Sequence, residues 1–276
     1  MRPISVAAVL VFGCVTAALG QAPVVNGALN DASFTVGQGV APGSLVAIFG
    51  SNFGSGLTLA STVPLSNQLG GASVTINGIP APLVGVASTQ INAAVPWGAL
   101  TPGTPSGTAQ VVVTTSAGSS APFSMPLLSM APGLFDITSN GDSTGVHRPA
   151  AYNNVDYTLP LPAGVVIPPF SSRPSKHLED VVLWATGLGQ VTNPPSDGQP
   201  GLGAAPFSAA MTLPTVLVGG VQAQVSFAVL SPEFPTIYQI AIKIPAGAPA
   251  GDAVPVQIQQ NGITTTNNLK IAISTQ

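Results

Sequence analysis

The sequence predicts an all-β protein built from two tandem β-sandwich domains. Three observations lead to this prediction: short segments that alternate apolar and polar residues, two-residue turns between them, and a series of such segments that occurs twice. Composition supports it as well. The 276 residues include 31 Gly and 28 Pro, which interrupt nearly every stretch that might form a helix. Hydrophobic residues make up 45%, enough to build a core.

The alternation has the period of two that half-buried strands require. It is clearest in the second half, at residues 221–229, 240–244, 254–258 and 269–273, and it occurs in the first half at residues 73–76. Tight hairpin turns favour Asn-Gly and Gly-Gly pairs, because both central residues need positive φ. Such pairs occur at Asn77-Gly78, Gly219-Gly220 and Asn261-Gly262.

The same series of segments occurs in each half. Residues 44–50, 73–78, 90–96 and 110–115 in the first half correspond in order to residues 180–187, 215–220, 239–245 and 254–259 in the second. Each half would hold about seven short strands, the number expected of an immunoglobulin-like (Ig-like) sandwich. The alternative is two unrelated β domains whose strands merely look alike.

Several motifs resemble a known family. Asp31-Ala-Ser-Phe and residues 40–53 resemble the opening of an IPT/TIG-type Ig-like domain, and residues 70–83, Gln90-Ile-Asn and Val95-Pro96 extend the resemblance. Together with Ala185-Thr-Gly-Leu-Gly, they resemble the uncharacterised C-terminal domain family of Solibacter-type secreted proteins. The resemblance implies export and paired sandwiches. It implies no activity, so no functional residue is carried over, and this chain departs from the family pattern around residues 152–176.

The first residues are typical of a secretory signal peptide. Arg2 precedes an apolar run, and Ala18-Leu-Gly20 supplies the small residues of a cleavage site, so we expect residues 1–20 to be removed. Two alternatives remain: a membrane anchor, for which residues 4–19 fall short of the roughly 20 that a spanning helix needs, and lipidation at Cys14. After cleavage the chain has no cysteine and no membrane span. We expect a secreted protein, extracellular or at the cell surface, with the periplasm as a further compartment.

Charge excludes several classes of function. Only 5% of residues are charged, against about 25% in ordinary domains, and the net charge is −3. A nucleic-acid binder needs a basic excess, which this chain lacks. No Asp, Glu, Lys, Arg or His occurs between Asp31 and Asp136. The 104 residues between them, which make up most of the first domain, therefore have no group for acid–base catalysis.

The central region contains a weak candidate calcium site. Asp136, Asn140 and Asp142 offer oxygen ligands of the kind that Ca²⁺ prefers. Their spacing does not match the EF-hand, and Asn140-Gly-Asp142 is also typical of an ordinary turn. We therefore predict no metal and no cofactor.

The same region contains the ingredients of a catalytic site. His147 lies beside Arg148, and His177 lies near Glu179 and Asp180, but the sequence has no Gly-x-Ser-x-Gly motif. Solvated linker charges explain these residues equally well, so we expect no enzyme. An enzyme would place a histidine beside an acid and a hydroxyl in a cleft.

The two tryptophans are the aromatic candidates for ligand binding. Trp97 follows Pro96 at the end of a predicted strand, and we expect it to be exposed and able to bind a ligand. Trp184 lies between Leu183 and Ala185, and we expect it in the core or between the sheets.

We predict a first sandwich at residues 21–130, a linker with a Pro-rich excursion at residues 131–177 that belongs partly to the second domain, and a second sandwich at residues 178–276. The excursion should pack loosely, with trypsin cutting first at Arg148, Arg173 or Lys176. The predicted function is a non-catalytic interaction module that binds an extracellular protein or polysaccharide. The alternative is a structural spacer without a ligand, and an enzyme ranks third.

Overall fold

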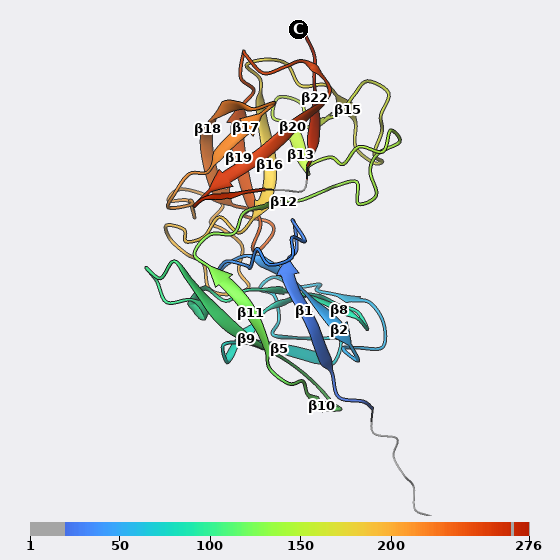
Figure 1. Ribbon diagram of the computed structural model, residues 1–276, viewed down its shortest axis with the longest axis vertical. Coiled ribbons are helices and arrows are strands. Elements are labelled where there is room, and N and C mark those ends of the chain that lie inside the picture. The colour runs from blue at the N-terminus through green and yellow to red at the C-terminus, as the bar shows by residue number, and fades with distance from the viewer. Residues whose placement is uncertain (1–19, 266–267, 276) are drawn as a thin grey trace, which may run out of the picture.

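The structure is a computed structural model that describes residues 20–265 and 268–275 (Figure 1). Its regular structure is almost entirely β, and the helical element among these residues is one short 3-10 turn, η1 (Trp97–Ala99). In the described part, no helix is long and apolar enough to cross a membrane. The all-β prediction is confirmed. The predicted signal segment, including Cys14, lies outside the described residues except for Gly20.

Two sheets form the first sandwich, shown in blue to green in Figure 1. One has the order β1-β2-β8-β7-β3, and the other has the order β10-β9-β5-β4 with β11 also on β9 and β6 on β5. Ile48 and Ile91 from one sheet meet Val74 and Val113 from the other in a fully buried core. The strands are β1 (Val24–Asn30), β2 (Leu45–Ser51), β3 (Thr58–Leu59), β4 (Gln68–Leu69), β5 (Ala72–Ile76), β6 (Ile79–Ala81), β7 (Leu83–Val86), β8 (Gln90–Ala94), β9 (Ser106–Thr115), β10 (Gly118–Ser119) and β11 (Phe123–Leu128).

The second sandwich is one sheet that folds over on itself, in the order β12-β16-β19-β18-β17-β20-β21 with β13 on β16 and β22 on β20. Strand β18 joins the two layers, because residues 221–223 pair with β17 and residues 224–230 with β19. The strands are β12 (Gly133–Leu134), β13 (Ala151–Asn153), β14 (Leu159–Pro160), β15 (Ser172–Arg173), β16 (Asp180–Thr186), β17 (Thr215–Val218), β18 (Val221–Leu230), β19 (Tyr238–Lys243), β20 (Gly251–Gln260), β21 (Ile263–Thr264) and β22 (Lys270–Ile273).

The strand pairing repeats between the two halves. Strand β2 pairs with β8 as β16 pairs with β19, and β5 pairs with β9 as β17 pairs with β20, all antiparallel. The predicted hairpin turns are also present, with positive φ at Asn77-Gly78, Gly219-Gly220 and Asn261-Gly262. Similar topology in both halves confirms the internal repeat as tandem Ig-like sandwiches.

Backbone and side-chain contacts join the two sandwiches. The Asn30 side chain donates to the carbonyl of Ala131 at 2.8 Å, and the amide of Leu45 donates to the Thr186 hydroxyl at 3.0 Å. Two further hydrogen bonds run from the amide of Trp97 to the carboxylate of Asp197 and from the amide of Leu65 to the carbonyl of Gly198. The second domain therefore fixes the loops at one end of the first.

The segment between the sandwiches is better packed than its proline content suggests. Strands β12 and β13 pair with β16, and Leu159, Leu161 and Val165 form a small core of their own. Arg148, which we expected to be open to trypsin, is 1% exposed. That expectation is wrong, because Arg148 forms a buried ion pair with Asp142.

Candidate binding face

The sheet of the second domain has an outer face between β13 and β18. Alternate residues of β16, Val181, Leu183 and Ala185, point into the core. The residues between them lie on the opposite face, where Tyr152 pairs with Val182 and Trp184 pairs with Gln239. Strand alternation thus places Tyr152, Trp184 and Gln239 together on the outside.

Four aromatic rings form a continuous row on this face. The ring centroids are 5.5 Å apart for Tyr157 and Tyr152, 6.4 Å for Tyr152 and Trp184, and 5.8 Å for Trp184 and Phe234. These spacings lie within the range of favourable aromatic contacts. Tyr157 is 71% exposed and Phe234 is 49% exposed, while the two middle rings are partly buried. We call Tyr157, Tyr152, Trp184 and Phe234 the aromatic row.

Local hydrogen bonds hold the two outer rings in place. Tyr157 lies at φ +59° in a turn closed by its own amide, which donates to the carbonyl of Asn153 at 2.9 Å. The amides of Glu233 and Phe234 both donate to the hydroxyl of Ser231 at 3.2 Å, and Ser231 is fully buried. Both rings therefore project from anchored turns, which reduces the entropy that a ligand would have to remove.

Polar groups accompany the row. Gln239 lies directly beside Trp184 in the sheet, and Glu233 precedes Phe234. Burial raises the pKa of Tyr152, and the charges of Tyr157 and Glu233 raise it further. The Tyr152 hydroxyl therefore stays protonated at neutral pH and can donate a hydrogen bond.

Apolar surface continues past Gln239 into a hollow of about 230 Å³. Phe207 and Phe227 line it and are 48% and 41% exposed. A contiguous exposed apolar area of this kind marks interaction sites in soluble proteins. The aromatic row and this hollow together form the candidate binding face.

Trp184 was expected in the core, and the structure instead places it on this outer face, partly exposed. The sequence from Val181 to Ala185 is apolar throughout, so its alternation could not assign a face to the ring. The contact between Trp184 and Tyr152 is equally invisible in the sequence, since the two residues are distant along the chain.

Trp97 lies at the junction of the two domains. It is partly buried and packs against the core of the second domain. A Cβ on Gly43 would come within 2.1 Å of the indole ring, so the backbone there approaches the ring closely. This packing gives Trp97 a structural role, and a role in ligand binding stays a prediction.

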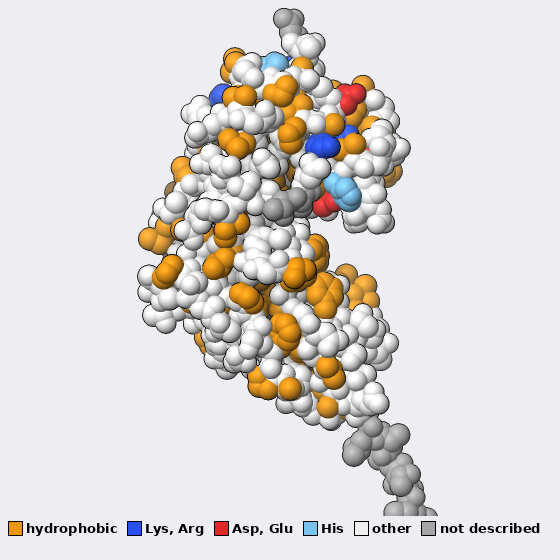
Figure 2. Space-filling model, viewed as in Figure 1, with side chains coloured by type: hydrophobic (Ala, Val, Ile, Leu, Met, Phe, Trp, Pro, Cys, Tyr) orange, Lys and Arg blue, Asp and Glu red, His pale blue; other side chains and the backbone are white. Residues whose placement is uncertain are grey.

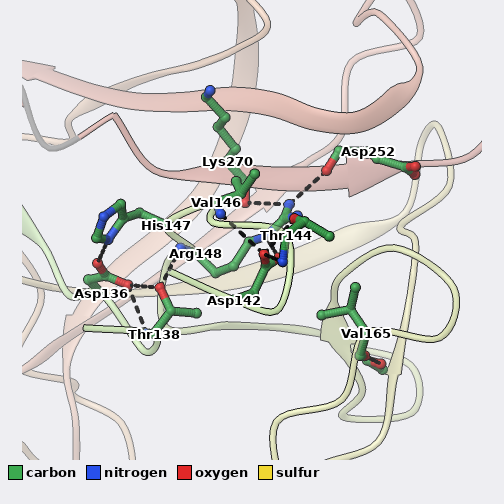
Figure 3. Close-up of polar contacts among 11 residues, drawn as sticks. Asp136, Thr138, Asp142, Thr144, Val146, His147, Arg148, Val165, Asp252 and Lys270 are labelled. Carbon is green, nitrogen blue, oxygen red and sulfur yellow. Dashed lines mark hydrogen bonds and ion pairs between the residues drawn. The ribbon is translucent and has the colours of Figure 1, made fainter. Parts of the chain in front are cut away.

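Two of the candidate calcium residues, Asp136 and Asp142, belong to a hydrogen-bonded loop (Figure 3). The Asp136 carboxylate accepts from Thr138 and lies 2.5 Å from Nδ1 of His147, while the Asp142 carboxylate accepts from Thr144, Val146 and Arg148. Asn140 is exposed. Each carboxylate thus has its own set of protein donors. Within the described residues, no group of three or more His, Cys, Asp and Glu side chains is arranged to hold a metal ion.

The histidines lie apart from one another. His147 is exposed and contacts Asp136, and Nε2 of His177 lies 2.9 Å from the carbonyl of Ala248. The Thr138 hydroxyl donates to Asp136, so this hydroxyl serves the acid and not the imidazole.

Figure 2 shows charged side chains on the second domain, while the visible face of the first carries apolar and uncharged polar groups.

Comparison with solved structures finds remote likenesses over most of the chain. One is the γ-CGTase of the alkalophilic Bacillus clarkii, with 16% identity, a TM-score of 0.26, and coverage of 90% of this chain and 25% of that one. A second is the SGBP-B protein of the Bacteroides ovatus mixed-linkage glucan utilization locus, in complex with a mixed-linkage heptasaccharide, with 12% identity, a TM-score of 0.32, and coverage of 87% and 45%. Domains 5–6 of the S-layer protein SbsC give 11% identity and a TM-score of 0.23, with coverage of 92% and 100%.

The chain thus spans a quarter and less than half of the first two proteins. These likenesses are too remote to assign a ligand or an activity to it. No protein of curated function matches the sequence. A match to a domain family is more specific, since the model of the IPT/TIG domain covers residues 33–126, from the loop after β1 into β11. The first sandwich of this chain is accordingly an IPT/TIG-like domain.

Proposed function

We propose that this protein is a secreted or cell-surface, non-catalytic module that binds a polysaccharide through the aromatic row. The observation that carries the proposal is the row itself: four touching rings on the outer face of a sheet, with both end rings well exposed. Exposed aromatic side chains are costly to leave in water, and they combine an apolar ring with, in tyrosine, a polar tip.

A sugar ring suits this surface better than a charged partner does. Sugars present apolar C–H faces and polar hydroxyl edges. The row offers rings for the former, and the Gln239 amide, the Glu233 carboxylate and the tyrosine hydroxyls for the latter. With only 5% of its residues charged, the protein has little electrostatic means of attracting a partner.

The non-catalytic part of the proposal rests on the placement of the titratable groups. The first domain has none between Asp31 and Asp136. In the second, Asp142 pairs with Arg148, and Asp156 and Glu179 both pair with Arg173. These pairs stabilise loops, including the turn at residues 153–158 that carries Tyr157.

Export, the domain boundaries and the wider family complete the proposal. The signal segment at residues 1–20 supports export. The repeated strand pairing supports sandwiches at about residues 21–130 and 178–276. Strands β12 and β13 of the intervening segment belong to the sheet of the second sandwich. The motifs shared with the uncharacterised Solibacter-type family extend into the second half, which supports membership of the whole chain.

Affinity electrophoresis through gels containing cell-wall polysaccharides tests the function. Tyr157→Ala should weaken retardation by about fivefold or more, the loss typical of an exposed aromatic anchor. Phe170→Ala is the control, because Phe170 is an exposed aromatic residue, 48% exposed, that lies outside the row. Equal retardation of the two variants would contradict binding through the row. A protein that no polysaccharide retards would support the spacer alternative.

A further inference from the structure

Asn140 and Gly141 lie in a loop of the second domain, outside any strand, and Asn140 is exposed. The Asn140 side chain and the Gly141 amide make no hydrogen bond to any other residue that the structure describes. The backbone on either side is held. The amide of Asn140 donates to the carbonyl of Thr138 at 2.5 Å, and the amide of Asp142 donates to the carbonyl of Val146 at 2.8 Å. A free asparagine side chain thus lies next to a free backbone amide.

An asparagine followed by glycine can react with its own backbone. The nitrogen of the glycine attacks the side-chain carbonyl carbon and forms a carbon–nitrogen bond. The bond between that carbon and the side-chain nitrogen breaks, and ammonia leaves with the proton from the glycine nitrogen. Water then opens the resulting cyclic imide at either carbonyl, which gives aspartate or isoaspartate. Glycine favours the attack, because it has no Cβ to crowd the nitrogen and its backbone is the most permissive.

The fold requires glycine at position 141. Gly141 has φ +87°, a conformation that residues with a Cβ rarely adopt. A Cβ at this position would also lie 2.9 Å from the backbone of Gly145. The loop therefore keeps the most reactive kind of neighbour next to Asn140.

The chain contains three other Asn-Gly pairs, at Asn26, Asn77 and Asn261. The side chain of Asn77 is held at both ends. Its amide donates to the carbonyl of Ala99 at 2.9 Å, and its oxygen accepts from the amide of Gln110 at 2.9 Å. Both hydrogen bonds have to break before this side chain can react.

Sheet pairing restrains the other two. Asn26 is the extra residue of a bulge in β1, with paired residues on both sides. Asn261 lies in the two-residue turn between β20 and β21, which the pair Gln260–Ile263 closes. Closing the imide ring has to rotate a peptide that these strand pairs hold. Asn140 has no strand pair next to it.

We propose that Asn140 is a site of spontaneous deamidation in the folded protein, and that it reacts ahead of the other three Asn-Gly pairs. The product adds one negative charge to a net charge of −3. The charge falls beside a hollow of about 350 Å³ that Ser139 and His147 line together with Phe34 of the first domain. It also falls in the loop that contains the Asp136–His147 pair. This modification is independent of the proposed polysaccharide binding.

Peptide mass spectrometry after incubation of the folded protein at mildly alkaline pH tests the proposal. Chymotrypsin, cutting after Phe135 and Tyr152, should release residues 136–152, in which Asn140 is the only asparagine. A parallel sample is incubated unfolded in guanidinium chloride, where the four Asn-Gly pairs should react at similar rates. In the folded protein we expect Asn77 to react at least about tenfold more slowly than Asn140, because two hydrogen bonds have to break first.

Asn140→Gln is the decisive variant, because glutamine keeps the amide but has to close a larger and slower-forming ring. It should remove the early acidic species in ion-exchange chromatography. Asn26→Gln is the matched control and should leave that species unchanged. Equal rates for Asn140 and Asn77 in the folded protein would overturn the proposal, as would a faster reaction at Asn26 or Asn261. The same holds if folding slows Asn140 as much as it slows Asn77.

Discussion

Arg148 is buried in the second domain, and its guanidinium is surrounded by oxygen atoms (Figure 3). Nε donates to Asp142 at 2.7 Å, and Nη1 donates to the carbonyls of Asp252 and Lys270 at 2.7 and 3.2 Å. Burial alone would raise the pKa of Asp142, but hydrogen bonds from Thr144, Arg148 and Val146 outweigh it and hold that pKa well below its usual range. The pair ties the loop at residues 136–148 to β20 and β22.

Replacing Arg148 should therefore destabilise the protein strongly. Arg148→Met leaves the Asp142 carboxylate buried without its partner, which costs about 3–5 kcal/mol of unfolding free energy. Lys243→Met is the control, because the Lys243–Asp180 pair is 37% and 46% exposed and such pairs contribute about 0–1 kcal/mol. Chemical denaturation measures both variants. Equal losses would show that Arg148 stabilises the fold no more than a surface ion pair.

Asp31 should make the free energy of unfolding fall as the pH rises. Burial raises the pKa of Asp31 from 3.8 to about 7, although a hydrogen bond from Asn92 at 2.8 Å lowers it in part. The native state thus holds a proton that the unfolded chain has already released. Stability from this group is present below pH 3.8 and is lost as the pH rises to about 7.

Asp31→Asn should remove this loss. We expect equal stability of the variant and the unmodified protein below pH 3.8, and a variant more stable by on the order of 1–3 kcal/mol at about pH 8. Thermal unfolding across this range measures the difference. A difference that does not change with pH would exclude Asp31 as its cause. Asn92→Leu removes the hydrogen-bond donor that lowers the pKa of Asp31. The midpoint of the pH dependence of stability should therefore move to higher pH in this variant.

At the scale of single elements, the sequence predicted the turns and the repeat well, because both depend on local chemistry. Asn77-Gly78 and Gly219-Gly220 needed only the positive φ that those residues allow. The face on which Trp184 lies could not be predicted, because an apolar run has no alternation to assign it. Arg148 meets the carbonyls of Asp252 and Lys270, and Tyr152 meets Trp184, across long stretches of chain. The sequence alone therefore could not show that these residues come together.

The hairpin between β17 and β18 offers a test of what each turn glycine contributes. Both Gly219 and Gly220 have positive φ, at +60° and +82°. A Cβ on Gly219 would also lie 2.3 Å from the Pro249 ring, whereas a Cβ on Gly220 would meet nothing within 4 Å. Gly220→Ala should cost about 1–2 kcal/mol, from backbone strain alone. Gly219→Ala should cost more, because the Pro249 ring is fixed to its backbone and cannot turn away. Equal losses in chemical denaturation would mean that the loop at Pro249 yields freely.

At the scale of the whole molecule, the candidate binding face depends on the two domains holding a fixed arrangement. The aromatic row lies on the second domain alone, but Phe234 at its end also lines a groove of about 450 Å³ whose other wall, at Leu59 and Val63, belongs to the first domain. Hydrogen bonds at Asn30, Leu45 and Leu65 and the packing of Trp97 hold these two walls in a fixed position relative to each other. Contact with both walls of this groove thus requires a stable junction, which binding on the row does not.

Trp97→Ala tests this coupling. The ring packs against the core of the second domain and over Gly43, so its removal should cost about 3–5 kcal/mol, as for other large-to-small core substitutions. Because the loss falls at the junction, calorimetry should resolve two transitions in the variant where the unmodified protein shows one. Phe170→Ala, on an exposed ring away from the junction, should keep the single transition. If Trp97→Ala lowers the melting temperature but leaves one transition, the domains are coupled mainly through the hydrogen bonds at Asn30, Leu45 and Leu65, and not through the indole.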